Sequence, residues 1–424
     1  MGYVILLILN LCTPFAALGV VIFFLISPRR KLLRNLRYEL SQRFVLRRQG
    51  QKIKKSLWIH AASVGEVRSV IKLAKLLKEY YGCELIITTS TAAGQNTALK
   101  EPLFDKALLM PVDCYPLIKR FIKFYNPKYL FIVESDLWPN MISACANNGV
   151  KVSIVNGRLS ERSARRYKLI SPLTKMLFKK MTFICAQTEE IAQRYISSGA
   201  AADKVYSCGN IKYDLLNDSP SKIEEVEEVF RALGWENAFI TVCGSTHEEE
   251  EQIIISAAKE LKEIKFVIAP RHLERKKQIL RALKDSGLRY ASLSSYKREG
   301  DLKDCQILLA DAMGWLGAFY KKGTVCFVGG SISRCGGHNF LEAAVFAKPV
   351  IFGQYYYNTP DVAEALLKSG GGILAGEKDF AAKLKNLFDD KALLAASGAA
   401  AGECSLSFKG ATDRTLKVVE KYGK

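Results

Sequence analysis

Short apolar runs alternate with amphipathic stretches along the chain after residue 55. Runs such as "LWIHA" (57–61) and "YLFIVES" (129–135) have the length and apolar content of buried strands. The stretch "EVRSVIKLAKLLKEYY" (66–81) has the spacing of a helix with one apolar face. Strands that alternate with helices in this way are typical of a parallel sheet covered by helices on both faces. The pattern therefore predicts an α/β fold.

The alternation stops once and then resumes. The polar stretch "NDSPS" (217–221) contains a proline and is typical of a linker. Beyond it, apolar runs such as "AFITVCGS" (238–245) and "TVCFVGGS" (324–331) recur. We therefore expect two Rossmann-like, doubly wound domains that face a cleft, because ligands bind at the carboxyl ends of such sheets. The expected boundaries are 56–217 for the first domain, 218–405 for the second and 406–424 for a C-terminal helix.

The N-terminal region predicts a membrane anchor. Residues 1–28 contain no charged side chain, and as a helix they would cross the ~30 Å of a bilayer's hydrocarbon core. Residues 29–55 form a basic collar with eleven Lys and Arg against Glu39 alone. The positive-inside rule then places everything after the span in the cytoplasm. A cleaved signal peptide is disfavoured because its basic residues precede the apolar stretch.

Charge predicts an anionic partner. The collar carries half of the formal net charge of +20, which suits nucleic acid, a membrane surface or a phosphorylated substrate. A basic block beside a membrane span favours anionic lipid, and no nucleic-acid-binding signature occurs. The eleven cysteines include no C-x-x-C pair. They indicate a reducing compartment, with neither a disulfide framework nor a zinc site.

The four histidines are His60, His247, His272 and His338, and each lies at the end of an expected strand or in the turn after it. A single histidine in such a place is as often a hydrogen-bonded structural residue as a functional one. No H-x-x-x-H pair occurs, so the sequence does not predict a metal site.

The segment "HAASVGEV" (60–67) allows two roles for Glu66. Ser63 and Glu66 fit the S-x-x-E capping box, in which the glutamate accepts from the helix cap. The same carboxylate follows the first strand, where Gly65 and its small neighbours leave room for a substrate. It could then accept a proton from an attacking hydroxyl. We expect the two roles to exclude each other in any one conformation.

Further polar clusters follow other strands. Glu134 and Asp136 are two residues apart and are expected to face one side of an extended strand. The arginines of "NGRLSERSARRYK" (156–168), beginning with Arg158, suit phosphate groups or form a solvated helix face. The segment "CGSTHEEEE" (243–251) predicts a helix that starts at Ser245 or Thr246.

A glycine-rich turn gives the strongest local signal. In "VGGSISRCGGHNFLEAA" (328–344), Gly336 and Gly337 precede a helix expected to begin at Asn339. Free amides at that helix start would hold a phosphate, and Glu342 could accept from ribose hydroxyls. The turn is neither G-x-G-x-x-G after the first strand nor a Walker loop. Dinucleotide oxidoreductases and P-loop NTPases are therefore disfavoured.

Taken in order, these motifs resemble those of the 3-deoxy-D-manno-octulosonic acid (Kdo) transferases, from the apolar N-terminus to about residue 365. The motifs concerned are "HAASVGEV", "TTSTAAGQ", "VESDLWPN", "NGRLSERSARRY", "GNIKYD", "GSTHEEEE", "APRHLER" and "GGSISRCGGHNFLEAA". The resemblance implies an inverting glycosyltransferase of the GT-B type at the cytoplasmic face of the inner membrane. It would move Kdo from CMP-Kdo to the glucosamine disaccharide of a lipid A precursor (lipid IVA) in lipopolysaccharide core biosynthesis.

The resemblance also implies roles for single residues. Glu66 would be the general base, and Glu134 and Lys212 would support the transition state. The family's CMP contacts fall on Pro270, Arg271, Met313, Gly314, Asn339, Phe340, Leu341 and Glu342. Where the family often has an acid, this chain has Trp315, whose indole could stack on cytosine. Further candidates beside the motifs are Ser63, Gly65, His60, Arg158, His272, Gly336, Gly337 and His338. No metal or other cofactor is expected.

Two other functions remain open at this level. One is a glycosyltransferase of the same architecture that uses a UDP-sugar, which competition by CMP against UDP would separate. The other is a non-catalytic scaffold that binds anionic lipid through the collar. That scaffold would need residues 1–55 and would not need Glu66.

Overall fold

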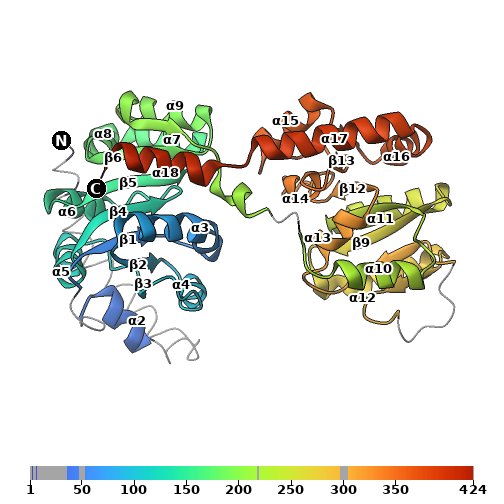
Figure 1. The fold of residues 1–424 in the computed structure, drawn as a ribbon, viewed down its shortest axis with the longest axis horizontal. Helices are drawn as coiled ribbons and strands as arrows, with labels where there is room; N and C mark the ends of the chain where they lie inside the picture. Colours follow the sequence, from blue (N-terminus) through green and yellow to red (C-terminus); the bar gives the residue numbers. More distant parts are fainter. Residues whose placement is uncertain are drawn as a thin grey trace. The chain divides into compact units, whose positions relative to one another are not determined.

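The computed structural model describes Gly2, Leu6 and residues 36–46, 53–216, 219–296 and 304–423. The chain forms two compact units, each with a seven-stranded sheet. Unit 1 comprises Met1–Leu215 and Lys409–Lys424, and unit 2 comprises Leu216–Phe408. Every pairing between strands of the described residues is parallel (Figure 1). The predicted pair of doubly wound α/β domains is therefore confirmed as a fold class.

Unit 1 has the strand order β3-β2-β1-β4-β5-β6-β7. Its strands are β1 (Ser56–His60), β2 (Glu84–Thr89), β3 (Lys106–Leu109), β4 (Pro127–Val133), β5 (Lys151–Gly157), β6 (Met181–Ala186) and β7 (Val205–Ser207). Its helices are α2 (Leu36–Arg43), α3 (Val64–Tyr81), α4 (Ala92–Ala98), α5 (Tyr115–Tyr125), α6 (Pro139–Asn147), α7 (Glu161–Leu169), α8 (Ser171–Lys179), α9 (Glu189–Ser197) and α18 (Ala411–Lys421), with 3₁₀ turns η2 (Ala202–Lys204) and η3 (Ile211–Leu215). The strand order reverses between β1 and β4. Ligands bind at such a switch point in open α/β sheets.

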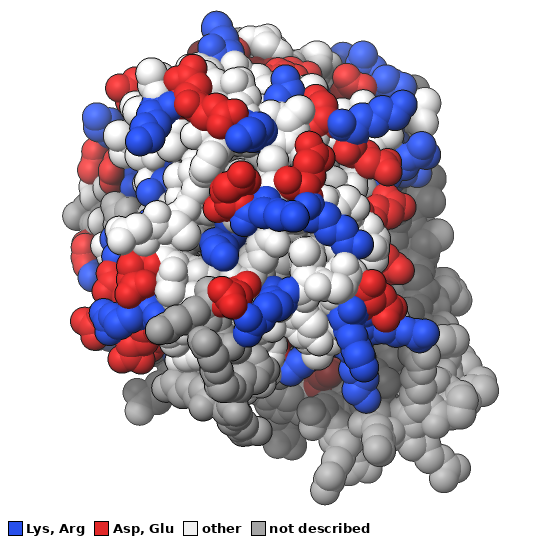
Figure 2. Space-filling model, turned by 90° about the vertical axis from the view of Figure 1, so that its right-hand side faces the viewer, with Lys and Arg blue, Asp and Glu red and all other residues white. Residues whose placement is uncertain are grey.

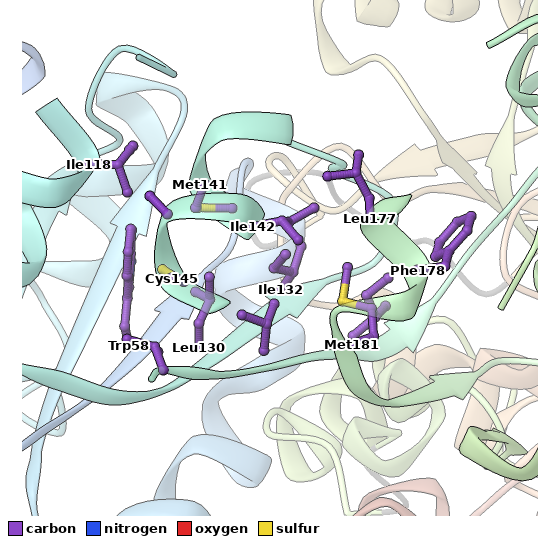
Figure 3. Packing of buried hydrophobic residues seen from close by; sticks show 14 of the residues in the cluster. Trp58, Ile118, Leu130, Ile132, Met141, Ile142, Cys145, Leu177, Phe178 and Met181 are labelled. Carbon is purple, nitrogen blue, oxygen red and sulfur yellow. The ribbon is translucent and has the colours of Figure 1, made fainter. Parts of the chain in front are cut away.

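The central strands of unit 1 are buried on both faces, which explains their continuous apolar sequences. On one face, Trp58 of β1 and Leu130 and Ile132 of β4 pack beneath α6 and α8, and all three side chains are fully buried (Figure 3). The Trp58 ring lies 4.4 Å from that of Phe121 in α5. Burial of each large apolar side chain contributes about 1.5–3 kcal/mol. The carboxyl ends of these strands are therefore held firmly.

Unit 2 has the order β10-β11-β9-β8-β12-β13-β14, so its switch point lies between β8 and β12. Its strands are β8 (Phe239–Thr246), β9 (Ile264–Pro270), β10 (Tyr290–Ser292), β11 (Ile307–Leu309), β12 (Val325–Val328), β13 (Val350–Phe352) and β14 (Gly372–Leu374). Its helices are α10 (Ile223–Ala232), α11 (Glu248–Glu260), α12 (Lys276–Ser286), α13 (Leu316–Lys322), α14 (Leu341–Ala344), α15 (Pro360–Ser369), α16 (Phe380–Asp389) and α17 (Lys391–Ser407), with the 3₁₀ turn η4 (Leu273–Arg275).

The C-terminal helix returns to unit 1. Helix α17 ends in unit 2 at Ser407, and α18 packs with the elements of unit 1 (Figure 1). The Asp214 carboxylate accepts from the amides of Gly410 (2.6 Å), Ala411 (3.2 Å) and Thr412 (2.5 Å) at the start of α18. The helix predicted at 406–424 is thus α18, and the aspartate of "GNIKYD" caps it.

The predicted anchor at 1–28 lies outside the described residues, apart from Gly2 and Leu6. Leu6 is 7% exposed and belongs to the core of unit 1. Within the described ranges, no helix is long and apolar enough to cross a bilayer. Part of the basic collar forms α2, where the Gln42 side-chain oxygen accepts from the Leu109 amide of β3 (2.7 Å). That part of the collar is docked on the sheet edge.

Candidate active site

Glu66 lies in the first turn of α3, directly after β1. Its Oε2 accepts from the Ala62 amide (2.8 Å), and its Oε1 accepts from the Ser63 hydroxyl (3.0 Å). Ser63 is the N-cap and accepts from the Glu66 amide (3.4 Å). Ser63 therefore caps α3 as predicted, but Glu66 accepts from the amide of Ala62, one residue before the cap, in place of the cap amide expected for a capping box.

Glu66 can still accept a proton while it caps the helix. Each carboxylate oxygen can accept two hydrogen bonds, and the cap uses one on each. The expected exclusion between capping and catalysis is therefore not required by this geometry. Burial raises the pKa of Glu66 despite the two bonds from the cap, and the negative charges of Glu134 and Asp136 raise it further. A half-buried carboxylate with a raised pKa is a better proton acceptor near neutral pH.

Glu134 follows β4 in a strained conformation. Its φ of +61° lies in the left-handed region, which is uncommon for residues other than glycine. The residue is only 8% exposed, and its Oε1 lies 2.6 Å from Nζ of Lys212 in η3. Strained residues of this kind cluster at functional sites. Two residues that the family resemblance paired in function are thus paired in space, although 78 positions separate them.

The prediction that Glu134 and Asp136 face one side of an extended strand is wrong. The strand ends at Val133, and the positive φ of Glu134 turns the chain. The Asp136 carboxylate instead lies 3.5 Å from Nε2 of His60, while Glu134 binds Lys212.

His60 is a positioning residue beneath this turn. It is fully buried, and its Nε2 accepts from the Trp138 indole N–H (3.1 Å). Its proton therefore resides on Nδ1, which donates to Thr88 Oγ1 (3.0 Å). The sequence singled out His60 but not Trp138 or Thr88, because their contact depends on strand order. The bonds among His60, Thr88 and Trp138 connect β1 and β2 to the turn that contains Glu134.

The other end of that turn is held by Asp113. Its carboxylate accepts from the amides of Asn140 (3.0 Å) and Met141 (2.7 Å) at the start of α6, and burial raises its pKa to about 6. After β5, the Arg158 amide donates to the Glu134 carbonyl (3.4 Å), and the Arg158 side chain is exposed.

Gly65 is also exposed, which fits the space expected beside Glu66.

In unit 2, the buried carboxylate of Glu250 organises the glycine-rich turn. It accepts from the backbone amides of His247 (3.0 Å), Gly330 (2.9 Å), Ser331 (3.0 Å), Ile332 (3.0 Å) and Ser333 (3.2 Å). Glu250 itself is fully buried. Nothing in the sequence indicated this role, because the amides of the turn that Glu250 binds lie about 80 positions further along the chain. The helix expected to start at Ser245 or Thr246 has His247 as its N-cap.

The expectation of free amides at a helix beginning at Asn339 is wrong. Helix α14 begins at Leu341 and has four residues. The Leu341 amide donates to the Asn339 side-chain oxygen (3.2 Å), and the Glu342 amide donates to the Asn339 carbonyl (3.2 Å). Of the predicted CMP contacts here, Phe340 and Leu341 are fully buried, and the Phe340 ring stacks on Phe352. Asn339 and the exposed Glu342 remain available to a ligand.

Three histidines, which follow β8, β9 and β12 in the chain, lie close together in unit 2. Nε2 of His247 lies 3.1 Å from Nε2 of His338, and the His247 ring lies 5.7 Å from that of His272. Burial lowers the pKa of His247, and it lowers the pKa of His338 to about 4. Both are therefore neutral near neutral pH, and one donates to the other. Gly330 is required beside them, because its φ is +73° and a Cβ there would lie 2.9 Å from the His338 ring.

Arg271 supplies the positive charge of this cluster. It follows Pro270, the last residue of β9, and its amide donates to the Thr246 carbonyl (3.0 Å). Its side chain is exposed, and it forms no ion pair with an acid of the described ranges. After burial, its charge is the next cause of the lowered pKa of His338. The turn at Gly336 and Gly337, both with positive φ, leads directly into His338. Such a group can bind an anion.

The Met313–Trp315 turn is formed by a glycine with φ +82°. Met313 is 78% exposed. The Lys222 ammonium lies 4.5 Å from the centre of the Trp315 ring, so one indole face is already occupied. Stacking of Trp315 on cytosine stays a prediction for the other face.

Comparison with solved structures identifies the class of fold. UDP-GlcNAc 2-epimerase from Neisseria meningitidis aligns with 87% of this chain and 100% of its own, with a TM-score of 0.60 and 14% identity. At this identity the likeness concerns the fold alone. The fold is of the GT-B type, with two Rossmann-like domains.

Sequence comparison identifies the family. The family described as 3-deoxy-D-manno-octulosonic-acid transferase (kdotransferase) matches residues 38–215. A 3-deoxy-D-manno-octulosonic acid transferase from Haemophilus influenzae is 31% identical over 86% of this chain and 87% of its own length. A bifunctional glycosyltransferase/methyltransferase from Fusobacterium nucleatum is 33% identical over 79% of this chain, which spans only 53% of that protein. The chain belongs to the Kdo transferase family and is a glycosyltransferase. The non-catalytic scaffold is therefore excluded.

Proposed function

We propose that the protein transfers Kdo from CMP-Kdo to a hydroxyl of the glucosamine disaccharide of a phosphorylated lipid A precursor, with inversion at the anomeric carbon. Membership of the Kdo transferase family supports Kdo as the sugar that is transferred. The observation that carries the proposal is the placement of Glu66, a capped carboxylate of raised pKa near the Glu134–Lys212 pair.

In the proposed reaction, Glu66 accepts the proton of the acceptor hydroxyl while the hydroxyl oxygen bonds to the anomeric carbon of Kdo. The bond from that carbon to the phosphate oxygen breaks, and CMP leaves with the electron pair. Lys212, held by Glu134, supports the charge that develops near the acceptor. Arg271 and the neutral histidines meet the phosphate of the leaving CMP, because cations and hydrogen-bond donors stabilise charge as it develops.

The proposal includes attachment to the cytoplasmic face of the inner membrane. Its support is the uncharged segment at 1–28 and the basic collar at 29–55. A lipid acceptor resides at that surface.

Mass analysis of the product tests the reaction. Purified protein is incubated with CMP-Kdo and lipid IVA, and the product is expected to gain the mass of at least one Kdo residue, which is Kdo less one water. Competition distinguishes the alternative donor, because CMP should inhibit and UDP should not. Inhibition by UDP alone, with no gain of Kdo, would instead support a UDP-sugar transferase.

The rate of transfer should depend on the ionisation of Glu66. The base must be unprotonated, so kcat/KM should fall as the pH drops through the Glu66 pKa, which burial raises above its ordinary value of 4.5. The Ser63 hydroxyl bonds the charged form and lowers this pKa. Ser63→Ala should therefore move the acid limb of the pH–rate profile to higher pH. A limb that stays in place would show that another group is titrating.

Transfer should persist in the presence of a chelator. The charge of the leaving phosphate can be met by Arg271 and the histidines of unit 2, and no group of three or more His, Cys, Asp or Glu among the described residues is suited to a metal ion. Initial rates in EDTA should match those in buffer. Loss of activity in EDTA that Mg²⁺ restores would contradict the prediction.

A further inference from the structure

An exposed apolar tip lies where α7 meets α8. The two helices join without a loop, because Ile170 ends one and precedes the other. Leu169 is 84% exposed and Ile170 is 40% exposed. We name residues 161–180 the α7–α8 corner. Two adjacent large apolar residues in water need an explanation.

Packing against the core of unit 1 holds the corner in place, so the exposure of Leu169 is a stable feature of the fold. Helix α8 buries Leu177 and Phe178 in the core of unit 1 (Figure 3). The ring of Tyr167 in α7 packs edge-on against Phe178, with centres 6.3 Å apart. The Thr174 hydroxyl donates to the Tyr167 carbonyl (3.3 Å). These contacts hold Leu169 in an exposed position.

Exposed basic side chains lie on both helices of the corner. The corner contains one acid, Glu161, which is paired with Arg165 (3.0 Å). The exposed basic residues are Arg162, Arg165, Arg166, Lys168, Lys175 and Lys179. Arg162, Arg165 and Leu169 recur at helical spacing and therefore share one face of α7. By contrast, the face of the molecule in Figure 2 mixes acidic and basic residues.

We propose that the α7–α8 corner docks onto an anionic bilayer surface, with Leu169 in the interface and the basic side chains on lipid phosphates. An apolar tip inside a basic rim is the composition of an interfacial membrane contact. Nucleic acid would use the basic rim but leave the apolar tip unexplained. The acceptor lipid of the proposed function, on which this inference rests in part, lies in the same surface.

The position of the corner supports this occupant. Arg158 lies three residues before α7, and its amide is bonded to the Glu134 carbonyl. The corner is thus continuous with the proposed acceptor site. Gly2, at the start of the apolar N-terminal segment, lies against α8, since a Cβ there would be 2.6 Å from the Pro172 carbonyl oxygen. Docking through the corner would bring the acceptor site to the lipid headgroups.

The direct test measures contact with lipid and needs no enzymatic activity. The full-length Leu169→Trp variant is reconstituted into phosphatidylglycerol vesicles that contain brominated lipid, and quenching is compared with the wild type. Extra quenching is expected from the introduced indole, and none is expected from Leu406→Trp, a control at a 62% exposed leucine of unit 2. Equal quenching in the two variants, or none in either, would overturn the proposal.

A second test separates docking from catalysis. The double variant Arg165→Glu, Arg166→Glu should lower kcat/KM for acceptor in anionic vesicles by about fivefold or more for each basic residue lost. Leu169→Glu should lower the same kcat/KM, because it places a charge in the apolar tip. Rates on acceptor dispersed in detergent should not change, and Leu406→Glu should be normal in both. An equal loss in detergent would assign the corner to acceptor binding or folding and contradict docking. If no variant transfers Kdo at all, the proposed function fails, while the quenching result still decides docking.

Discussion

Glu66→Gln should lower kcat for Kdo transfer by about a hundredfold to ten-thousandfold, the usual contribution of a general base. Glutamine can serve in a capping box as glutamate does. Its side-chain oxygen can still accept from the Ala62 amide, which now bonds Glu66 Oε2 (2.8 Å). The start of α3 should therefore persist while the proton acceptor is lost. Steady-state rates and thermal unfolding measured on the same preparation check both halves.

The matched control for Glu66→Gln is Ser63→Ala. This variant removes the cap hydroxyl that bonds Glu66 (3.0 Å) and keeps the carboxylate. It should lose about 1 kcal/mol of stability and retain most of its turnover at a pH above the Glu66 pKa. CMP should bind both variants as it binds the wild type, because the cytidylate is assigned to unit 2. Normal turnover by Glu66→Gln would remove Glu66 as the base, whatever its effect on stability.

Local patterns predicted the fold and part of the site. The apolar runs around Trp58 and Leu130 became buried parallel strands, since only strands covered on both faces are so uniformly apolar. The S-x-x-E signal at Ser63 and Glu66 described a single helical turn, and the structure contains that turn. Such features depend on neighbours in sequence, so a sequence pattern can reveal them.

Contacts across long separations could not be predicted from such patterns. Lys212 reaches Glu134 because η3 follows β7 and folds back toward the end of β4. The positive φ of Glu134 is fixed by bonds to Val155 and Tyr195 on other elements. The family resemblance, and not the spacing, brought these residues together before the structure was known.

The glycine-rich turn of unit 2 shows why an interpretation from neighbouring residues alone can be wrong. Consecutive glycines and a following helix suggested amides open to a phosphate. In the fold, the amides of Leu341 and Glu342 at that helix start donate to Asn339. Earlier in the turn, amides from Gly330 to Ser333 converge on the Glu250 carboxylate, which is 80 or more residues away in sequence. The Glu250 carboxylate thus holds the turn, and the turn positions His338. In the proposed function, the anionic ligand is bound by Arg271 and the histidines.

Glu250→Gln should destabilise unit 2 by about 3 kcal/mol or more. The side chain is fully buried and both of its oxygens accept from amides, so the new NH₂ group would face N–H donors. Each buried donor left without an acceptor costs about 1–3 kcal/mol. For a unit of this size, each kcal/mol lowers Tm by about 2–4 °C. Thermal unfolding of the full-length protein measures the shift.

Glu249→Gln is the matched control, because it makes the same change of charge at the exposed neighbouring position. Its Tm should equal that of the wild type. At a temperature where both variants are folded, only Glu250→Gln should weaken CMP binding, since Gly330 then no longer positions the His338 ring beside Arg271. Calorimetric titration with CMP separates these outcomes. If the two variants share one Tm and one CMP affinity, the Glu250 carboxylate does not organise the turn.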